Sequence, residues 1–193
     1  MKIIATIISR IFEPVVIFTV LMLTALTRSG LEVFAYYRFI SVFFFLMVLP
    51  PMAFLVWAVQ TKKISNWDVG DRKQRVKALG LFLIFQVLNV VLTWIYGNVY
   101  LLHLMIFFLL WFLGFYLITL FWKISGHSGL TALGAVLIIQ WFGPAWWPVL
   151  LAIPLVSWAR VVRRDHTVGQ VVGGVGYSIV ILLLRKGLGV SIM

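Results

Sequence analysis

The chain of 193 residues contains no cysteine and few charged side chains. Without a thiol it forms no disulfide framework, binds no zinc or iron–sulfur cluster through cysteine, and has no cysteine nucleophile. Charged residues make up 11% of the chain, whereas soluble domains have about 25%. This shortage of charge excludes an ordinary soluble domain.

Carboxylates are also scarce, and the five present are Glu13, Glu32, Asp68, Asp71 and Asp165. Apart from Asp68 and Asp71 they are far apart in the sequence, so we expect no metal ion. We also expect no cofactor. An Asp-x2-Asp pair also begins the signature of CDP-alcohol phosphatidyltransferases, which requires two further aspartates downstream. Residues 76–100 contain no aspartate, and a metal-dependent transferase of this kind is therefore excluded.

Apolar residues fill most of the chain: 63% of the residues are hydrophobic, and the mean hydropathy is +1.10. Several apolar runs approach the length of about 20 residues that spans a bilayer. The runs cover residues 12–27, 39–59, 78–96, 99–122, 128–142, 145–159 and 168–184. Gly97-Asn98 lies between the third and fourth runs and predicts a tight turn that joins them as a helical hairpin. We predict an all-α, polytopic transmembrane helical bundle of six or seven spans, formed by a single domain over residues 1–193. We expect a multi-pass integral protein of the cell membrane.

Positive charge predominates, with 16 Lys and Arg against five Asp and Glu and a net charge of +11. If all seven runs cross the membrane, most of these cations fall on one side, in three polar segments. The first covers residues 61–75, the second 122–129 and the third 158–170. Two spans separate each segment from the next, so all three can lie at one membrane surface. The pattern favours an anionic ligand and membrane lipids as partners, rather than nucleic acid.

The second polar segment contains Ser125-Gly126-His127-Ser128 at the predicted start of a helix. The N–H groups of a first helical turn bind anions, and Gly126 lets a ligand approach the backbone closely. Ser125 would serve equally as an ordinary N-cap beside an incidental interfacial histidine. Both interpretations stay open from these residues alone.

The third polar segment combines Arg160, the pair Arg163-Arg164 and His166, and Gln170 lies one helical turn after His166. A basic end to a membrane span explains the arginines, but it does not explain His166 and Gln170. The helix that follows is rich in glycine, at positions 169, 173, 174 and 176. We expect these glycines to allow close packing between helices.

Ser125-Gly126-His127 and Arg160-x5-His166 together resemble two signatures of the type 2 phosphatidic acid phosphatase and vanadium haloperoxidase superfamily. The family pattern is Pro-Ser-Gly-His followed by Ser-Arg-x5-His-x3-Asp. Here the two histidines occur in the same order, separated by two predicted helices. Three positions depart from the pattern: Ile124 stands where Pro is usual, Ala159 where Ser is usual and Gln170 where Asp is usual.

The resemblance implies a role for each of these residues. His166 would be the nucleophile that forms a phosphohistidine, His127 the general acid, and Gln170 the residue that orients the far ring nitrogen of His166. The residues implied in holding the phosphoryl oxygens are Arg160, Ser125, Gly126, Lys63, Arg72 and Lys123. The first polar segment lacks the family's Lys-x6-Arg-Pro pattern, so for Lys63 and Arg72 a solvated basic loop is the alternative.

The activity implied by the resemblance is metal-independent hydrolysis of a lipid phosphate or diphosphate, of the phosphatidate, phosphatidylglycerol phosphate or polyprenyl diphosphate class. The alternative is a catalytically silent relative that binds or moves anionic lipids. Gln170 and the incomplete first signature favour the alternative. Retention of both histidines favours the enzyme, because a lipid-binding protein needs cations but no paired nucleophile and acid.

Overall fold

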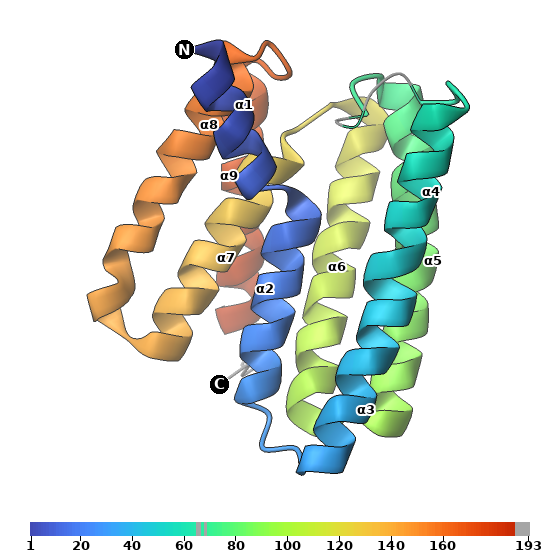
Figure 1. The fold of residues 1–193 in the computed structure, drawn as a ribbon. Coiled ribbons are helices and arrows are strands. Elements are labelled where there is room, and N and C mark those ends of the chain that lie inside the picture. The colour runs from blue at the N-terminus through green and yellow to red at the C-terminus, as the bar shows by residue number, and fades with distance from the viewer. Residues whose placement is uncertain (65–66, 68, 188–193) are drawn as a thin grey trace. The chain divides into compact units, whose positions relative to one another are not determined.

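The computed structural model describes residues 1–64, 67 and 69–187, and these residues form helices and connecting loops without a β-strand (Figure 1). The predicted all-α class is confirmed. Asp68, one half of the Asp68/Asp71 pair, lies outside the described residues. In chain order the elements are α1 (Lys2–Ile11), α2 (Pro14–Thr27), α3 (Val33–Phe43), the π-helical turn η1 (Phe44–Val48), α4 (Leu49–Gln60), α5 (Arg72–Tyr96), α6 (Val99–Phe121), α7 (Gly126–Phe142), the 3-10 helix η2 (Pro144–Leu151), α8 (Ala152–Val162) and α9 (Val168–Gly187).

Six helical segments in the described part of the chain are long and apolar enough to cross a membrane. They are Lys2–Thr27, Val33–Gln60, Arg72–Tyr96, Val99–Phe121, Pro144–Val162 and Val168–Lys186. The apolar helix α7 is shorter. Large apolar side chains are exposed along these segments, including Ile84, Trp94 and Leu110. Such surfaces suit a lipid environment, and the chain has the helices of a multi-pass membrane protein.

The contacts divide the chain into two compact units. Of the described residues, the first unit contains Met1–Met22 and the chain from Lys123 to Gly187, and the second contains Leu23–Trp122. The prediction of a single domain over residues 1–193 stays a prediction.

The second unit contains a helical hairpin and one long interrupted helix. The predicted tight turn at Gly97-Asn98 is confirmed, since α5 ends at Tyr96 and α6 begins at Val99 against it. The side chain of Asn98 caps α6 by accepting the N–H of Leu101 at 3.0 Å.

The run 39–59 belongs to a longer helix, Val33–Gln60, which widens to a π-helical turn just before Pro50 and Pro51. Prolines lack an N–H donor, which accounts for the local irregularity.

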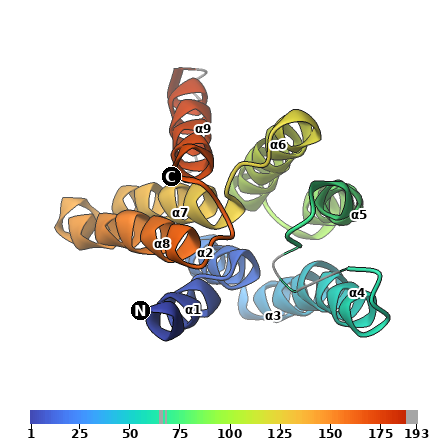
Figure 2. The ribbon, with the colours of Figure 1, turned by 90° about the horizontal axis from the view of Figure 1, so that it is seen from above.

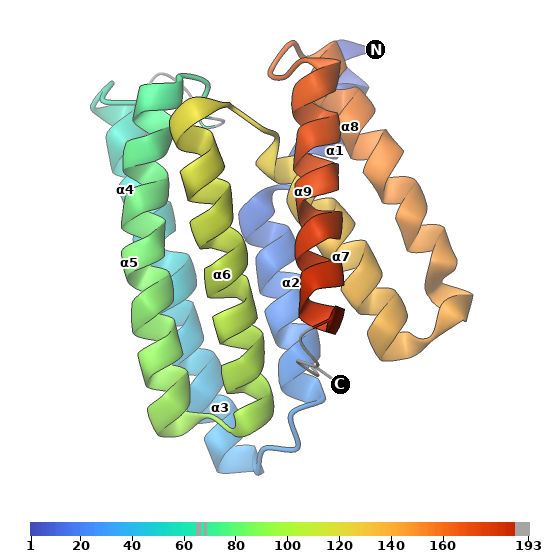
Figure 3. The same cartoon turned by 180° about the vertical axis from the view of Figure 1, so that it is seen from behind.

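The first unit packs α7 against α9 and α8 against α1 (Figures 2 and 3). A Cβ added at Gly174 would overlap the backbone carbonyl of Ser125, and one added at Gly129 would lie 2.9 Å from the oxygen of Gly174. The hydroxyl of Ser178 donates to the carbonyl oxygen of Gly129 at 2.7 Å. Close helix packing through glycine is therefore confirmed at Gly174. It is wrong at Gly176, where an added Cβ would meet nothing within 4 Å.

The N-terminal helix α1 is not among the predicted runs, of which the first begins at residue 12. Pro14 lacks an N–H that could bond the carbonyl of Arg10, and that carbonyl accepts the N–H of Glu13 at 3.3 Å instead. The helix therefore breaks between α1 and α2, at Phe12 and Glu13. Ala5 and Ser9 are buried on one face of α1, and this unit packs that helix against α8. The break places Glu13 at the start of α2.

Candidate functional site

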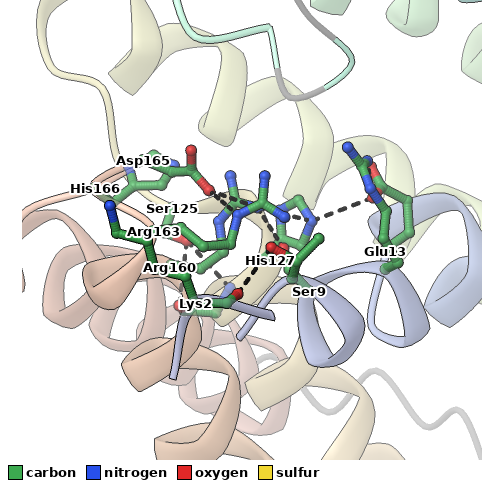
Figure 4. Close-up of polar contacts among 12 residues, drawn as sticks. Lys2, Ser9, Glu13, Ser125, His127, Arg160, Arg163, Asp165 and His166 are labelled. Carbon is green, nitrogen blue, oxygen red and sulfur yellow. Dashed lines mark hydrogen bonds and ion pairs between the residues drawn. The ribbon is translucent and has the colours of Figure 1, made fainter. Parts of the chain in front are cut away.

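The candidate site of the first unit is built around Arg160, which lies in the last turn of α8 and is 0% exposed. Its Nη1 donates to the hydroxyl of Ser9 and lies 3.3 Å from Oδ2 of Asp165. The same Nη1 lies 3.5 Å from Nε2 of His127. Figure 4 shows Asp165, Arg160, His127 and Glu13 joined in a row by these contacts.

The end of α8 explains the spacing of five residues between Arg160 and His166. Arg164 has a positive φ of 62°. Its N–H donates to the carbonyl oxygen of Val161 at 2.9 Å, and the N–H of Asp165 donates to the carbonyl oxygen of Arg160 at 3.1 Å. This pair of bonds is a Schellman motif, which turns the chain back over the last helical turn. The N–H of His166 then also reaches the carbonyl of Arg160, at 3.4 Å. Arg160 and His166 are therefore neighbours because of the backbone turn itself.

The N-terminus of α7 carries Ser125, His127 and Ser128. Ser125 is the N-cap, since its Oγ accepts the N–H of Ser128 at 3.3 Å. The hydroxyl of Ser128 also donates to this oxygen at 3.1 Å and accepts from the hydroxyl of Ser157 on α8 at 3.2 Å. His127 is buried, 6% exposed, and turns Nε2 toward Arg160. The ordinary N-cap interpretation of Ser125 is confirmed, and binding of phosphate by Ser125 and Gly126 stays a prediction.

His166 is 5% exposed and bonded to Gln170, as expected from their spacing of one helical turn. Its Nδ1 lies 3.1 Å from Oε1 of Gln170. The same Oε1 accepts the N–H of Thr167 at 3.2 Å, and the N–H of Gln170 donates to Oγ1 of Thr167 at 3.3 Å. Thr167 and Gln170 thus form a capping box at the start of α9. Because the amide oxygen Oε1 is an acceptor, Nδ1 of His166 is the donor, and in the neutral ring the lone pair is therefore on Nε2.

Two backbone contacts join the segments that carry the histidines. The N–H of Ser125 donates to the carbonyl of Gln170 at 2.9 Å. The missing side chain of Gly174 leaves room for the carbonyl of Ser125, one turn further along α9. The helix start that holds His127 is therefore docked on the helix that orients His166, within one compact unit.

Asp165 and Lys123 belong to the loop beside His166. Asp165 accepts from Nε of Arg163 at 2.7 Å and pairs with Arg160 through the same oxygen, Oδ2. The ammonium of Lys123 donates to the backbone oxygen of Asp165 at 3.1 Å. This brings the cation of Lys123 to the third polar segment, as a shared site requires. The carboxylate of Asp165 pairs with arginines, whereas the ring nitrogen of His166 is bonded by Gln170.

Lys63 and Arg72, which the resemblance implies as phosphate ligands of the first polar segment, belong to the second unit. The ammonium of Lys63 lies 4.0 Å from the ring centroid of Trp57, a cation–π contact. Nη1 of Arg72 donates to the carbonyl oxygen of Leu120. Both cations thus have contacts within their own unit, and a role in phosphate binding stays a prediction for each.

Two residues of the site, Ser9 and Glu13, were not predicted. They lie one helical turn apart near the break between α1 and α2. Oε2 of Glu13 lies 3.6 Å from Nε2 of His127 and 3.1 Å from Nη1 of Arg10. The sequence could have indicated Glu13, because an ionisable side chain within an apolar stretch is costly unless it has a function or a partner.

The site combines two buried histidines with a buried arginine, and the cations Arg10, Lys123 and Arg163 surround them. Such a group can hold a polyanion, attack it through an imidazole nitrogen and pass protons to it. Among the described residues, no group of three or more His, Asp and Glu is arranged to hold a metal ion. Comparisons of the chain with models of known families, with curated proteins and with solved structures give no match.

Proposed function

We propose that the protein is a membrane-embedded phosphatase that hydrolyses a lipid phosphate or diphosphate through a phosphohistidine on His166, without a metal ion. The observation that carries the proposal is that two buried histidines both contact Arg160. His127 does so through its ring nitrogen Nε2, and His166 does so through its backbone N–H. The resemblance of the two signatures to the type 2 phosphatidic acid phosphatase superfamily supports the same activity.

In the first step, Nε2 of His166 attacks phosphorus, and a P–N bond forms as the P–O bond to the lipid breaks. The leaving oxygen takes a proton from Nε2 of His127, so that the lipid departs as an alcohol or as a phosphorylated lipid. The hydrogen bond from Nδ1 of His166 to Gln170 supports this assignment, because it leaves the lone pair on Nε2. Arg160, with Lys123 nearby, stabilises the charge on the phosphoryl oxygens.

In the second step, water attacks the phosphohistidine and the P–N bond breaks. His127, now neutral, accepts the proton of the attacking water, and inorganic phosphate leaves. The two steps together return the site to its starting protonation. Gln170 fixes the tautomer of His166 but carries no charge, so it supports the cationic imidazole less than a carboxylate would. A modest turnover rate is the expected consequence.

The substrate class follows from the surroundings of the site. Its residues lie at the ends of apolar helices, where an amphiphile can offer its phosphate while its chains stay among apolar side chains. We therefore propose phosphatidate, phosphatidylglycerol phosphate or a polyprenyl diphosphate in preference to a soluble phosphate ester. A multi-pass location in the cell membrane belongs to the same proposal.

A lipid panel tests the proposal. The purified protein in detergent is given phosphatidate, phosphatidylglycerol phosphate and a polyprenyl diphosphate, and released phosphate is measured beside the His166→Ala variant. Hydrolysis of at least one lipid by the wild type alone is the expected result. If the folded wild type hydrolyses none of them but binds vesicles containing phosphatidate, the silent lipid-binding relative is correct instead.

A further inference from the structure

Two groups of opposite charge lie beside Nε2 of His127. Nη1 of Arg160 approaches it at 3.5 Å and Oε2 of Glu13 at 3.6 Å (Figure 4). Arg160 can only donate, so its contact suits a neutral His127 with a lone pair on Nε2. Glu13 as a carboxylate can only accept, so its contact suits a protonated His127. One nitrogen thus lies between groups that favour its two protonation states.

We infer that Glu13 is a positioning residue that holds His127 as the imidazolium, ready to protonate the leaving group. This inference rests on the proposed function, in which His127 is the general acid. When phosphate enters, its oxygens compete for the guanidinium of Arg160. Nε2 of His127 then keeps Glu13 as its charged partner, and a neighbouring carboxylate favours the protonated imidazole. After the proton has gone to the leaving oxygen, neutral His127 is ready to serve as the base of the second step.

The geometry of the N-terminal segment is suited to this role. Pro14 breaks the helix at Glu13, and burial of Ser9 fixes the preceding turn against Arg160. The side chain of Glu13 is 24% exposed and that of His127 8%. Their interaction is therefore less screened than that of a surface pair. Met1–Met22 belong to the same compact unit as the histidines.

The other charged groups around His127 determine how strongly Glu13 acts. From α1, Arg10 binds Glu13 at 3.1 Å and weakens its effect. From α8 and the following loop, Arg160 opposes protonation, and Asp165 partly offsets Arg160 by pairing with it at 3.3 Å. Arg163 in turn pairs with Asp165. Of the described residues, Glu13 contributes a carboxylate in contact with Nε2, and its removal leaves the guanidinium of Arg160 beside that nitrogen.

The test compares Glu13→Gln with Glu32→Gln, a matched control. Glu32 is an exposed N-cap of α3 whose side chain makes no capping hydrogen bond. Each protein is assayed from pH 5 to 9 with phosphatidate, which has a poor leaving group, and p-nitrophenyl phosphate, which has a good one. In Glu13→Gln, kcat/KM for phosphatidate falls about tenfold or more, while that for p-nitrophenyl phosphate changes little. The alkaline limb for phosphatidate moves to lower pH, because the general acid loses its proton more easily.

A second measurement does not depend on turnover. Protein labelled with 13C-histidine is titrated in detergent by NMR, and the His127 signal is assigned from its loss in His127→Gln. The protonation midpoint of His127 falls by about one pH unit in Glu13→Gln and is unchanged in Glu32→Gln. An unchanged midpoint in a folded Glu13→Gln protein overturns the inference, and the proposed hydrolysis can still hold. Absence of hydrolysis with a shifted midpoint overturns the proposed function, and the pairing of Glu13 with His127 stands.

Discussion

Nδ1 of His166 and Oε1 of Gln170 lie 3.1 Å apart, at the start of α9. The same oxygen accepts the N–H of Thr167 and so completes a capping box. Gln170 therefore both helps to cap the first turn of α9 and fixes the tautomer of the proposed nucleophile. An aspartate at this position, usual in the superfamily that the chain resembles, would supply a charge that the amide lacks.

Gln170→Asp and Gln170→Glu are both expected to maintain or raise the rate at neutral pH. A carboxylate stabilises His166 as it becomes cationic in the first step. Glutamate also matches the length of glutamine and preserves the capping box, so Gln170→Glu should keep the thermal stability of the wild type. The measurement is kcat with the panel lipid that is hydrolysed fastest.

Gln170→Ala is the matched loss-of-function variant, since it removes both hydrogen bonds. We expect a lower rate and a loss of about 1 kcal/mol in the free energy of unfolding from the lost cap. Equal rates in Gln170→Ala and wild type would show that the contact to His166 has no part in turnover.

The two histidines are expected to differ in their dependence on the leaving group. His166→Ala removes the covalent step and should abolish turnover of every substrate. His127→Ala should reduce hydrolysis of phosphatidate by about 10²–10⁴-fold. The loss with p-nitrophenyl phosphate should be smaller, because p-nitrophenolate needs little protonation. Identical losses for both substrates would rule out His127 as the general acid.

Activity should persist in EDTA and fall with orthovanadate. The proposed chemistry uses imidazole and guanidinium groups, so a chelator removes nothing that the reaction needs. Five-coordinate vanadate resembles the transferring phosphoryl group and can bond to the nucleophilic histidine. Release of phosphate from phosphatidate is the readout for both. A strict requirement for a divalent cation would contradict the mechanism.

Gly174 and Gly176 offer a matched pair for the packing of α7 on α9. Gly174→Ala forces a Cβ against the carbonyl of Ser125, whereas Gly176→Ala places one where nothing lies within 4 Å. Overpacking of this kind costs about 1–3 kcal/mol. Thermal unfolding in detergent should show a clear fall in Tm for Gly174→Ala and little change for Gly176→Ala. Equal Tm values would mean that the two helices do not pack through Gly174.

The fold class and the hairpin turn at Gly97-Asn98 could be predicted because length and hydropathy largely determine which segments become membrane helices. The helix over Lys2–Ile11 was missed, since its polar and apolar residues alternate with helical period and form no continuous apolar run. The glycine prediction failed at Gly176, because composition alone does not say which face of α9 meets α7.

Within the site, the contact of His166 with Gln170 was predictable because it is local, one helical turn apart. The contacts of Ser9 with Arg160 and of Glu13 with His127 join residues more than a hundred positions apart, and no local pattern marks them. The capping box could have been recognised, since Thr167-x-x-Gln170 precedes an apolar helix. The segment that contains Lys63 and Arg72 lacks the Lys-x6-Arg-Pro pattern, so the sequence did not determine what these two residues contact. In the structure Lys63 contacts Trp57, and Arg72 contacts Leu120.

The central claim is that His166 carries the phosphoryl group during turnover. The most direct measurement is a rapid alkaline quench of the purified protein with 32P-labelled lipid phosphate, followed by mass spectrometry of the labelled peptide. The account predicts a base-stable, acid-labile label on His166 in the wild type and no label in His166→Ala. Phosphate release at the wild-type rate by a folded His166→Ala protein would contradict it.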